Sequence, residues 1–482
     1  MKTTIFTLLL LSSMIFARDP IRDSIVQVST THRAYDYESP WAPPYLKRSE
    51  GSGFIIEGSR IVTNAHVIMN ASFIEIRSAS SHRWYEAEVK VVAHDCDLAI
   101  LEVKDPSFFE GKLPLNFGSE LLYQQEEVSV YGFPIGGREL SVTKGIVSRI
   151  DITSYAHSGA YLLTAQIDAP LNPGNSGGPV LSEGQVVGVA HQSLFPGRNI
   201  GYMIPIPIIK HFLEEVDRGE YVGFPEATFS LQPIRNPAMR KYYGIEEESG
   251  GLLVVSAPSN HDIGNLIERG DILLEVDHHP IDSYGWVKLK EYGISLPFQY
   301  LIMMKHFGDP IDLLVMRKGS LQELSCTITR SQKAKPLVKK EFDKPPSYFI
   351  IGGIVFQPLV ENYLRAIDFD QPHRFVDVLY HVIKGNGDKD RDEVVVLSSV
   401  LDDAANVGYQ HLEKKIVDKV NGKKIRSLIS FISEVEKVDQ EYIFITTQDG
   451  VEIILDRDLA IKRNPVIMNR YLINSDRSVD LQ

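Results

Sequence analysis

Several features that define large classes of protein are scarce in this chain of 482 residues. It has two cysteines, Cys96 and Cys326, which are too few for a disulfide scaffold and lack the spacing of a zinc site. There are 50 Lys and Arg against 63 Asp and Glu, and the net charge of −13 argues against a general nucleic-acid-binding protein. The charge-free apolar run Thr3–Ala17 is too short to cross a bilayer. We therefore expect no nucleic-acid partner, no integral membrane segment and no metal site.

The sequence also lacks a phosphate-binding loop of the GxxxxGK[ST] type, which argues against an ATP-driven machine. No cofactor is expected. What the chain does have is an ordinary globular composition, 43% hydrophobic and 23% charged. At roughly 150 residues per domain, its length suggests about three domains.

The first 17 residues have the composition of a leader. Lys2 precedes the apolar run, and the small Ala17 comes just before a polar stretch that contains Pro20. This pattern is typical of a secretory signal peptide cleaved after Ala17, the alternative being a buried N-terminal segment. We expect an exported protein, and the short leader with a single lysine favours a Gram-negative periplasm.

The remaining chain divides by its hydrophobic pattern into one β-rich part and two smaller mixed parts. Residues 18–220 contain short β-branched runs separated by Gly, Ser and Asn, which predict a barrel or sandwich. Two α/β modules with a shared strand pattern follow and are interpreted as two copies of one unit, the second divergent. We expect module 1 at 221–332 and module 2 at 347–465, with a polar linker at 333–346 and a tail at 466–482.

A serine between glycines lies in the run Leu171–Val180, which reads LNPGNSGGPV. Glycine allows a sharp turn that exposes the hydroxyl of Ser176, and backbone N–H groups in such a turn can stabilise an oxyanion. Gly174 and Ser176 are the candidate donors. A glycine-rich β-turn without chemistry is the alternative.

Two further residues complete a candidate catalytic set. His66 follows the β-run ending at Thr63, and Asp97 directly precedes the apolar strand that starts at Leu98. The chain order His66, Asp97, Ser176 is that of chymotrypsin-like barrels and differs from the orders of unrelated serine hydrolases. Asp95 is a competing candidate for the acid.

These motifs together resemble the HtrA/Deg family of serine endopeptidases, and most closely the plant-type Deg proteases. The resemblance implies a mainly β fold, with a chymotrypsin-like double β-barrel followed by two PDZ-like modules. It also implies that Ser176 is the nucleophile, that His66 is the general base and then acid, and that Asp97 rather than Asp95 orients the imidazole. The matching segments are Gly51–Phe54, Thr63–His66, Asp97–Leu101, Tyr131–Gly137, Gly174–Gly178 and Asn199–Pro205.

In this fold the primary specificity pocket is usually lined by residues just before the nucleophile and on the strand after it. The matching positions are Leu171, Val189, Ala190 and His191, and none of them is acidic. We therefore expect cleavage after small or medium aliphatic residues. His191 is unusual at its position, where it either narrows the pocket or points to solvent.

PDZ domains bind C-terminal peptides by adding a strand to a sheet edge, with a carboxylate loop that normally reads apolar-Gly-apolar. In module 1 the matching residues are Phe229, Ser230 and Leu231, so a serine replaces the glycine. The module either captures peptide tails or docks subunits and gates the protease. Family members are oligomers, so a homo-oligomer is expected. The aromatic loop Tyr35–Lys47 either reaches a neighbouring subunit or packs on its own barrel.

The leading hypothesis is an exported, ATP-independent serine endopeptidase that degrades unfolded or misfolded proteins through an acyl-enzyme. One alternative is a chaperone or scaffold that uses the barrel and PDZ modules without cutting. An esterase with the same three residues is a further alternative.

Overall fold

The structure is a computed structural model. It describes residues 20–135, 139–191, 201–246, 250–258, 261–290, 292–332, 336–367, 391–437 and 440–482. The expected leader at 1–17 lies outside these residues. Within them, no helix is both long enough and apolar enough to span a membrane.

Residues 20–103 form a closed six-stranded barrel with strand order β1-β2-β3-β6-β5-β4. Along its strands, apolar side chains at alternate positions point into the barrel, and Val26, Val28 and Leu101 are fully buried. The elements are α1 (Pro20–Ser24), β1 (Ile25–Ala34), β2 (Tyr45–Ile56), β3 (Arg60–Thr63), α2 (Ala65–Ile68), β4 (Ala71–Ser78), β5 (Tyr85–Ala93) and β6 (Leu98–Val103).

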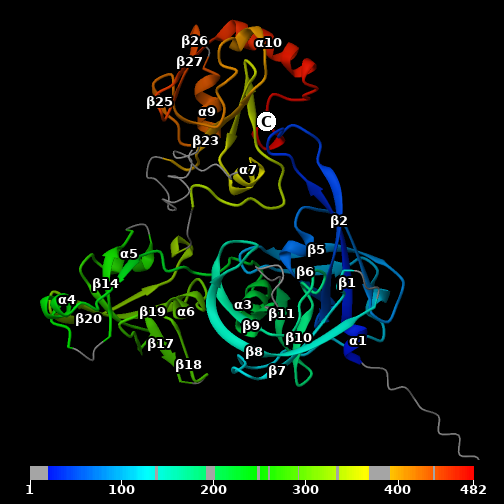
Figure 1. The fold of residues 1–482 in the computed structure, drawn as a ribbon, viewed down its shortest axis with the longest axis vertical. Helices are drawn as coiled ribbons and strands as arrows, with labels where there is room; N and C mark the ends of the chain where they lie inside the picture. The colour runs from blue at the N-terminus through cyan, green and yellow to red at the C-terminus, as the bar shows by residue number, and fades with distance from the viewer. Residues whose placement is uncertain are drawn as a thin grey trace, which may run out of the picture.

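A second closed barrel follows, with strand order β10-β11-β12-β9-β8-β7. Helix α3 closes this domain and packs against β11 and β12 through its apolar face, which includes Ile208, Ile209 and Phe212. Two barrels side by side confirm the expected mainly β, double-barrel fold (Figure 1). The elements are β7 (Glu127–Gly132), β8 (Ser141–Ser154), β9 (Tyr161–Ile167), β10 (Pro179–Ser182), β11 (Gln185–His191), β12 (Gly201–Pro205) and α3 (Ile206–Asp217).

Module 1 is a small sheet with strand order β13-β14-β15-β19-β20 and lies beside the barrels (Figure 1). A short strand pairs off this path with β15, and a separate hairpin is formed by β17 and β18. The elements are β13 (Ser230–Pro233), α4 (Pro237–Tyr243), β14 (Leu252–Ser256), α5 (Asp262–Leu266), β15 (Ile272–Val276), β16 (His279–Pro280), β17 (Trp286–Leu289), β18 (Ile294–Pro297), α6 (Gln299–Met303), β19 (Pro310–Arg317) and β20 (Ser320–Thr327).

Module 2 has strand order β22-β23-β24-β26-β27, extended at one edge by β21. A short strand again pairs off the path, here with β24, so the sheet order repeats that of module 1. The elements are β21 (Phe349–Ile351), β22 (Ile354–Pro358), α7 (Glu361–Ala366), β23 (Val395–Val400), β24 (Lys415–Val420), β25 (Lys423–Lys424), α9 (Leu428–Val435), β26 (Tyr442–Thr447), β27 (Glu452–Asp456) and α10 (Arg457–Arg470).

The segment expected as a tail, 466–482, packs onto module 2. The Ile350 N–H donates to the Asp476 carbonyl at 2.7 Å, and the Ser478 N–H donates to the Tyr348 carbonyl at 3.1 Å. These bonds satisfy backbone groups at the start of the edge strand β21, which would otherwise lack partners. The residues after 465 are therefore part of this module in the structure.

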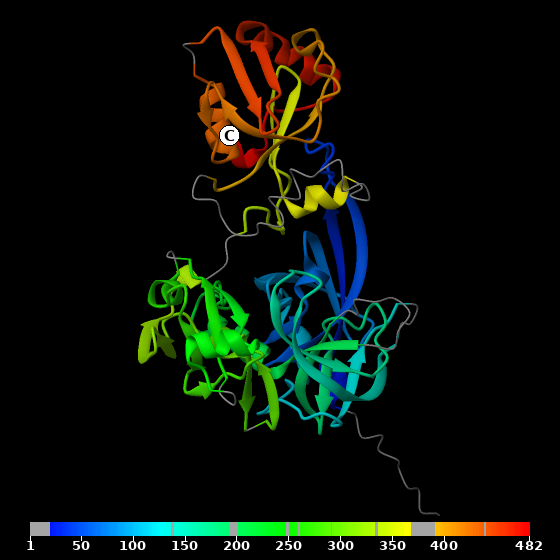
Figure 2. The ribbon, with the colours of Figure 1, turned by 60° about the vertical axis from the view of Figure 1, so that its left-hand side comes forward.

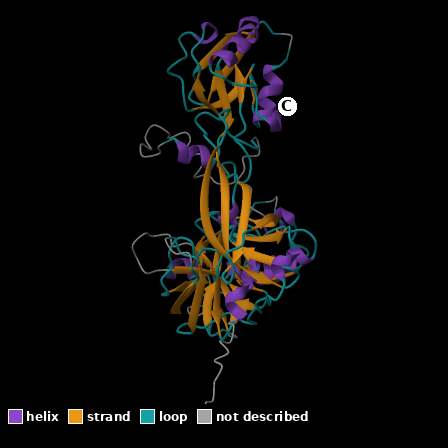
Figure 3. Cartoon of the chain, turned by 90° about the vertical axis from the view of Figure 1, so that its right-hand side faces the viewer, coloured by secondary structure: helices purple, strands orange, loops and turns teal. Residues whose placement is uncertain are grey.

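The β1–β2 hairpin rises from the first barrel and reaches module 2 (Figures 2 and 3). The Gln357 Nε2 donates to the Tyr37 carbonyl at 3.1 Å, and the ring of Trp41 meets that of Tyr348 edge-on at 6.3 Å. Leu337 and Val338 of the expected linker are buried in the same contact, beside Tyr37. The loop Tyr35–Lys47 thus packs on the last module of its own chain, which neither expected alternative included.

Candidate active site

His66 and Asp97 are brought together by the pairing of the strands beside them. Strand β3 pairs with β6 so that Thr63, the last residue of β3, lies opposite Ala99, the second residue of β6. His66 then lies in the single turn of α2, whereas Asp97 precedes β6 in a left-handed conformation with φ of 54°. Short-range turn chemistry at two neighbouring strand ends therefore sets the relative position of the two side chains.

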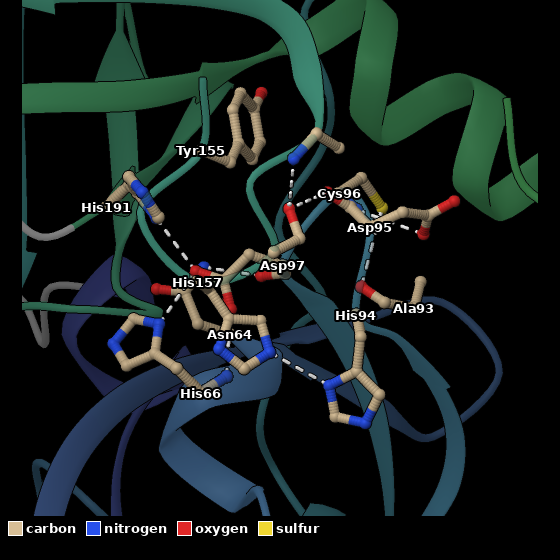
Figure 4. Close-up of polar contacts among 12 residues, drawn as sticks. Asn64, His66, Ala93, His94, Asp95, Cys96, Asp97, Tyr155, His157 and His191 are labelled. Atoms are coloured by element: carbon tan, nitrogen blue, oxygen red, sulfur yellow. Dashed lines mark hydrogen bonds and ion pairs between the residues drawn. The ribbon is translucent and has the colours of Figure 1, made fainter. Parts of the chain in front are cut away.

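Asp97 contacts His66 through both of its carboxylate oxygens. The His66 Nδ1 lies 2.7 Å from Asp97 Oδ2, and the His66 backbone N–H donates to Asp97 Oδ1 at 2.8 Å (Figure 4). Asp97 is fully buried, which by itself raises the pKa of its carboxyl group. The neighbouring His66 and His191 outweigh burial and hold the pKa of Asp97 well below its usual range. The carboxylate is therefore ionised at neutral pH.

The loop that carries Ser176 is anchored to the first barrel by Ser52. The Ser52 N–H donates to the Ser176 carbonyl at 2.8 Å, and the Ser52 hydroxyl donates to the Gly174 carbonyl at 2.7 Å. The same hydroxyl accepts from the Phe133 N–H at 2.9 Å. Gly177 has φ of 85°, and a Cβ there would lie 2.2 Å from the Ser52 carbonyl oxygen. Only glycine fits this approach, so the barrels meet closely at Ser176.

The backbone of the Ser176 loop presents two free N–H groups. The Ile135 N–H donates to the Pro173 carbonyl at 2.8 Å. This turns the Gly174 N–H to the opposite side of the same trans peptide. Within the described residues, neither the Gly174 nor the Ser176 N–H donates to another backbone group. Both expected oxyanion donors therefore lack a backbone acceptor among the described residues.

The Ser176 hydroxyl makes no hydrogen bond to His66 within the part of the chain that the structure describes. Such bonds are often long in enzymes without substrate and tighten on binding. The adjacent backbone still places the two residues together, because a Cβ at Gly51 would touch both Val67 of α2 and the Ser176 carbonyl oxygen.

His191 points toward Asp97 and is only 6% exposed, so the solvent-facing alternative is wrong. Its Nδ1 lies 2.8 Å from Asp97 Oδ2, the oxygen that also contacts His66 (Figure 4). The three side chains each offer one ligand atom within 4.8 Å of the others, a set that could also hold a metal ion. His191 is thus a partner of the acid, a role that its sequence position did not reveal.

The other expected pocket residues lie around the Ser176 loop. Val189 and Ala190 are fully buried, and Ala190 exchanges backbone hydrogen bonds with Gly177 and Gly178. Leu171 is partly buried and lies against Gly201, where a Cβ would come within 2.7 Å of its side chain. Residues 192–200, which follow His191, lie outside the described residues, and the preference for cleavage after aliphatic residues stays a prediction.

Asp95 faces away from His66. It accepts a hydrogen bond from the Tyr221 hydroxyl at 2.6 Å, near the end of the protease domain. This geometry agrees with the choice of Asp97 over Asp95.

Two further histidines near His66, His94 and His157, were not among the residues that the sequence predicted for the site. The ring of His157 lies 6.1 Å from that of His66, and its Nε2 lies 2.9 Å from His94 Nδ1 (Figure 4). Phe342 of the linker stacks on His94 at 4.1 Å, and Asp343 Oδ2 lies 2.7 Å from His94 Nε2. No sequence signal joins residues so far apart, because the contact depends on how the linker crosses the barrel.

In module 1, Phe229 is buried and stacks on Phe298 at 6.1 Å. Ser230 is exposed at the start of β13, and a register shift separates it from Leu231. A cleft of about 450 Å³ lies between the second barrel and this module. Its lining includes Ile152, Tyr161, Leu162, Phe224, Pro297 and Met303.

Two closed β-barrels with a His–Asp pair and a glycine-flanked serine between them define a serine peptidase of the trypsin-like class. The family model described as "Trypsin-like peptidase domain" matches residues 51–189, and "PDZ domain" matches residues 337–480. The second match identifies module 2, and it includes residues 337–346 of the expected linker and 466–480 of the expected tail.

Curated relatives match the sequence over nearly the whole chain. "Putative protease Do-like 3, mitochondrial" from Arabidopsis thaliana is 36% identical over 468 residues, which cover 97% of this chain and 81% of the relative. "Protease Do-like 2, chloroplastic" from the same plant is 34% identical, covering 95% and 75%. The chain therefore belongs to the Do-like (HtrA/Deg) family of serine endopeptidases.

Solved structures agree at the level of the fold. "HtrA-type protease AlgW with tripeptide" covers 64% of this chain and 94% of its own, with 19% sequence identity and a TM-score of 0.50.

Proposed function

We propose that the chain is an ATP-independent endopeptidase that degrades loosely folded proteins, with Ser176 as nucleophile, His66 as base and Asp97 as the orienting acid. The bidentate contact of buried Asp97 with His66, next to the Ser176 loop, carries this proposal. An ionised carboxylate on Nδ1 keeps the proton there and leaves Nε2 free to accept another.

In the proposed reaction, Nε2 of His66 takes the Ser176 proton as Oγ attacks the carbonyl carbon of the scissile bond. The Gly174 and Ser176 N–H groups would stabilise the oxyanion. The imidazolium then protonates the leaving amine, and an acyl-enzyme is left on Oγ. A water molecule, deprotonated by His66, hydrolyses this ester and restores the serine.

Substrates are expected to be extended chains, because a cleft between two barrels cannot admit a folded domain. The cleft beside Phe224 and Met303 supports capture of an apolar peptide end by module 1, although Ser230 replaces the usual glycine. Titration with hydrophobic C-terminal peptides tests this capture, and micromolar binding would support it. Light scattering tests the expected homo-oligomer, which a monomer mass would contradict.

The proposed compartment lies beyond the cytosol, with residues 1–17 as a targeting segment. Two relatives carry the words mitochondrial and chloroplastic in their names, which favours an organelle. The periplasm expected from the sequence has no support among these relatives. A fluorescent fusion to residues 1–30, imaged in the host cell, tests the proposal, and uniform cytosolic signal would contradict it.

Digestion of unfolded β-casein tests the central proposal. We expect the mature protein and a Ser320→Ala control, altered at the exposed first residue of β20, to cleave casein, whereas Ser176→Ala does not. Cleavage by Ser176→Ala would overturn the assignment of the nucleophile. If none of the three proteins cleaves casein but they still suppress aggregation of a model client, the chaperone alternative would be favoured. Turnover of small esters without casein cleavage would favour an esterase.

A further inference from the structure

A buried cluster of metal-ligand residues lies where module 1 meets the protease domain. His211 and Glu215 are one helical turn apart on α3 and share a face, whereas His306 lies just after α6 of module 1. All three are buried, with exposed fractions of 3%, 4% and 9%. One ligand atom of each lies within 4.8 Å of the others. The cluster thus joins the protease domain to module 1, because His306 lies 91 positions beyond Glu215 along the chain.

His211 is the member of this cluster that protein contacts leave unsatisfied. Neither Nδ1 nor Nε2 has a hydrogen-bond partner, although the backbone of Gly223 lies close to the ring. Buried polar groups normally have partners, so these orphaned nitrogens need an explanation.

The remaining members form a polar network with carboxylates on both sides of His306. Its Nδ1 lies 2.6 Å from Glu215 Oε1, and its Nε2 lies 3.0 Å from Glu214 Oε2. The other oxygen of Glu215 accepts from the Val222 N–H at 3.2 Å. The two carboxylates give both ring nitrogens of His306 a partner, but the nitrogens of His211 have none.

We propose that His211, Glu215 and His306 bind a zinc-type divalent ion that fixes module 1 on the protease domain, with Glu214 as a further available ligand. Two imidazoles and one carboxylate are an established ligand set for Zn²⁺, and imidazole nitrogen favours late first-row metals over Mg²⁺ or Ca²⁺. Binding would give His211 its missing partner.

Metal binding includes a side-chain rotation. The His211 ring now lies stacked between Phe224 and His306, with ring centres 4.2 Å apart in each pair. Coordination needs the nitrogen lone pairs, which lie in the ring planes, to converge on one point. One imidazole must therefore turn about its Cβ–Cγ bond, and the stack is the metal-free arrangement.

Zinc titration of the full chain tests this site without any need for activity. The Ser176→Ala background prevents self-cleavage, and competition with a chromophoric chelator reports stoichiometry and affinity for Zn²⁺ alone. We expect one ion per chain, with His211→Gln and His306→Gln weakening its binding by roughly tenfold or more, since even outer-shell changes cost that much. His278→Gln, at an 85% exposed side chain, is the matched control and should bind normally.

Two further variants keep the test decisive. His191→Gln disrupts the other ligand set, at Asp97, and should leave the high-affinity ion in place. His211→Phe keeps the aromatic stack but removes both nitrogens, so it should fold well and lose the zinc-induced rise in Tm. Equal zinc binding in all variants, loss of the ion only in His191→Gln, or no binding at ~100 μM zinc would each overturn the proposal.

Discussion

The carboxylate of Asp97 accepts from three groups around it: the backbone and ring of His66, and the ring of His191. Its backbone carbonyl accepts from the Asn64 side chain at 2.8 Å. A buried charge is tolerated only when its surroundings satisfy it, and each of these donors restricts the rotation of the carboxylate. We therefore regard His191 as a positioning residue for the proposed base.

Replacing His191 tests that role. We expect His191→Phe to lower kcat/KM for peptides by roughly tenfold, mostly through kcat, because Asp97 loses a donor but substrate contacts remain. His191→Gln, which can still donate, should restore much of the rate. An unchanged kcat in His191→Phe, or a loss confined to KM, would contradict the role.

The lowered pKa of buried His157 predicts that the stability of the fold depends on pH. Burial, reinforced by His66, His94 and Lys340 and opposed by Asp97, lowers its pKa to about 3, whereas an unfolded histidine has a pKa of about 6.5. Between these values the unfolded state binds the additional proton, so this group destabilises the fold as the pH decreases from about 6.5 to about 3. The slope is at most about 1.4 kcal/mol per pH unit.

Denaturant unfolding at several pH values between 7 and 4 measures this slope. In His157→Phe the decrease in unfolding free energy should be shallower than in the wild type, whereas the exposed control His278→Gln should follow the wild type. Parallel curves for His157→Phe and wild type would show that His157 is not held neutral.

At the scale of elements, the linker before module 2 packs on the barrel. Phe342 stacks on His94 at 4.1 Å and lies tilted against His157 at 4.7 Å, and Asp343 exchanges hydrogen bonds with Asn70, just after α2. Lys340 contacts the His157 carbonyl. The linker therefore packs on His157, whose ring lies 6.1 Å from that of His66, and we expect an extended substrate to need room on this side.

Truncating Phe342 should open this side of the cleft. We expect Phe342→Ala to raise kcat/KM for peptides of six or more residues by roughly threefold to tenfold, because its stacking contributes about 0.5–1.5 kcal/mol to keeping the linker in place. A small ester that reaches only Ser176 should be turned over at the wild-type rate. The control is Tyr123→Ala, at an exposed aromatic residue of the other barrel. Unchanged or lower peptide cleavage would show that the linker does not restrict access.

At the scale of the whole molecule, the β1–β2 hairpin connects the first barrel to the last module (Figure 3). Tyr37 is 8% exposed and packs with Leu337, Val338 and Leu359. Removal of a large side chain from such a cluster typically costs about 2–5 kcal/mol. The position of module 2 therefore depends on this hairpin as well as on the contacts of the linker with the barrel.

Tyr37→Ala should release module 2 from the hairpin. We expect faster hydrogen exchange in 337–364 and a larger radius of gyration by small-angle scattering, with the two barrels unaffected. Tyr37→Phe retains the ring and should behave like the wild type. Unchanged exchange in Tyr37→Ala would mean that other contacts hold the module.

The sequence by itself determined a β-rich barrel or sandwich, the repeated C-terminal modules and the candidate residues His66, Asp97 and Ser176, and its resemblance to the HtrA/Deg family implied the double barrel. The candidate residues and the modules rest on local signals: the glycines that the sharp turn at Ser176 requires, the short turn that places His66 after β3, and the strand pattern that both modules share. Such signals lie within a few residues of each position, so they survive in the sequence.

Tertiary structure alone decided which distant groups meet. His191 turned out to face Asp97, Phe342 covers His94, the residues after 465 complete the edge of module 2, and His211 lies beside His306. Each contact joins residues far apart along the chain or from different domains. Their proximity depends on how whole sheets, hairpins and modules pack, and no local pattern encodes that packing.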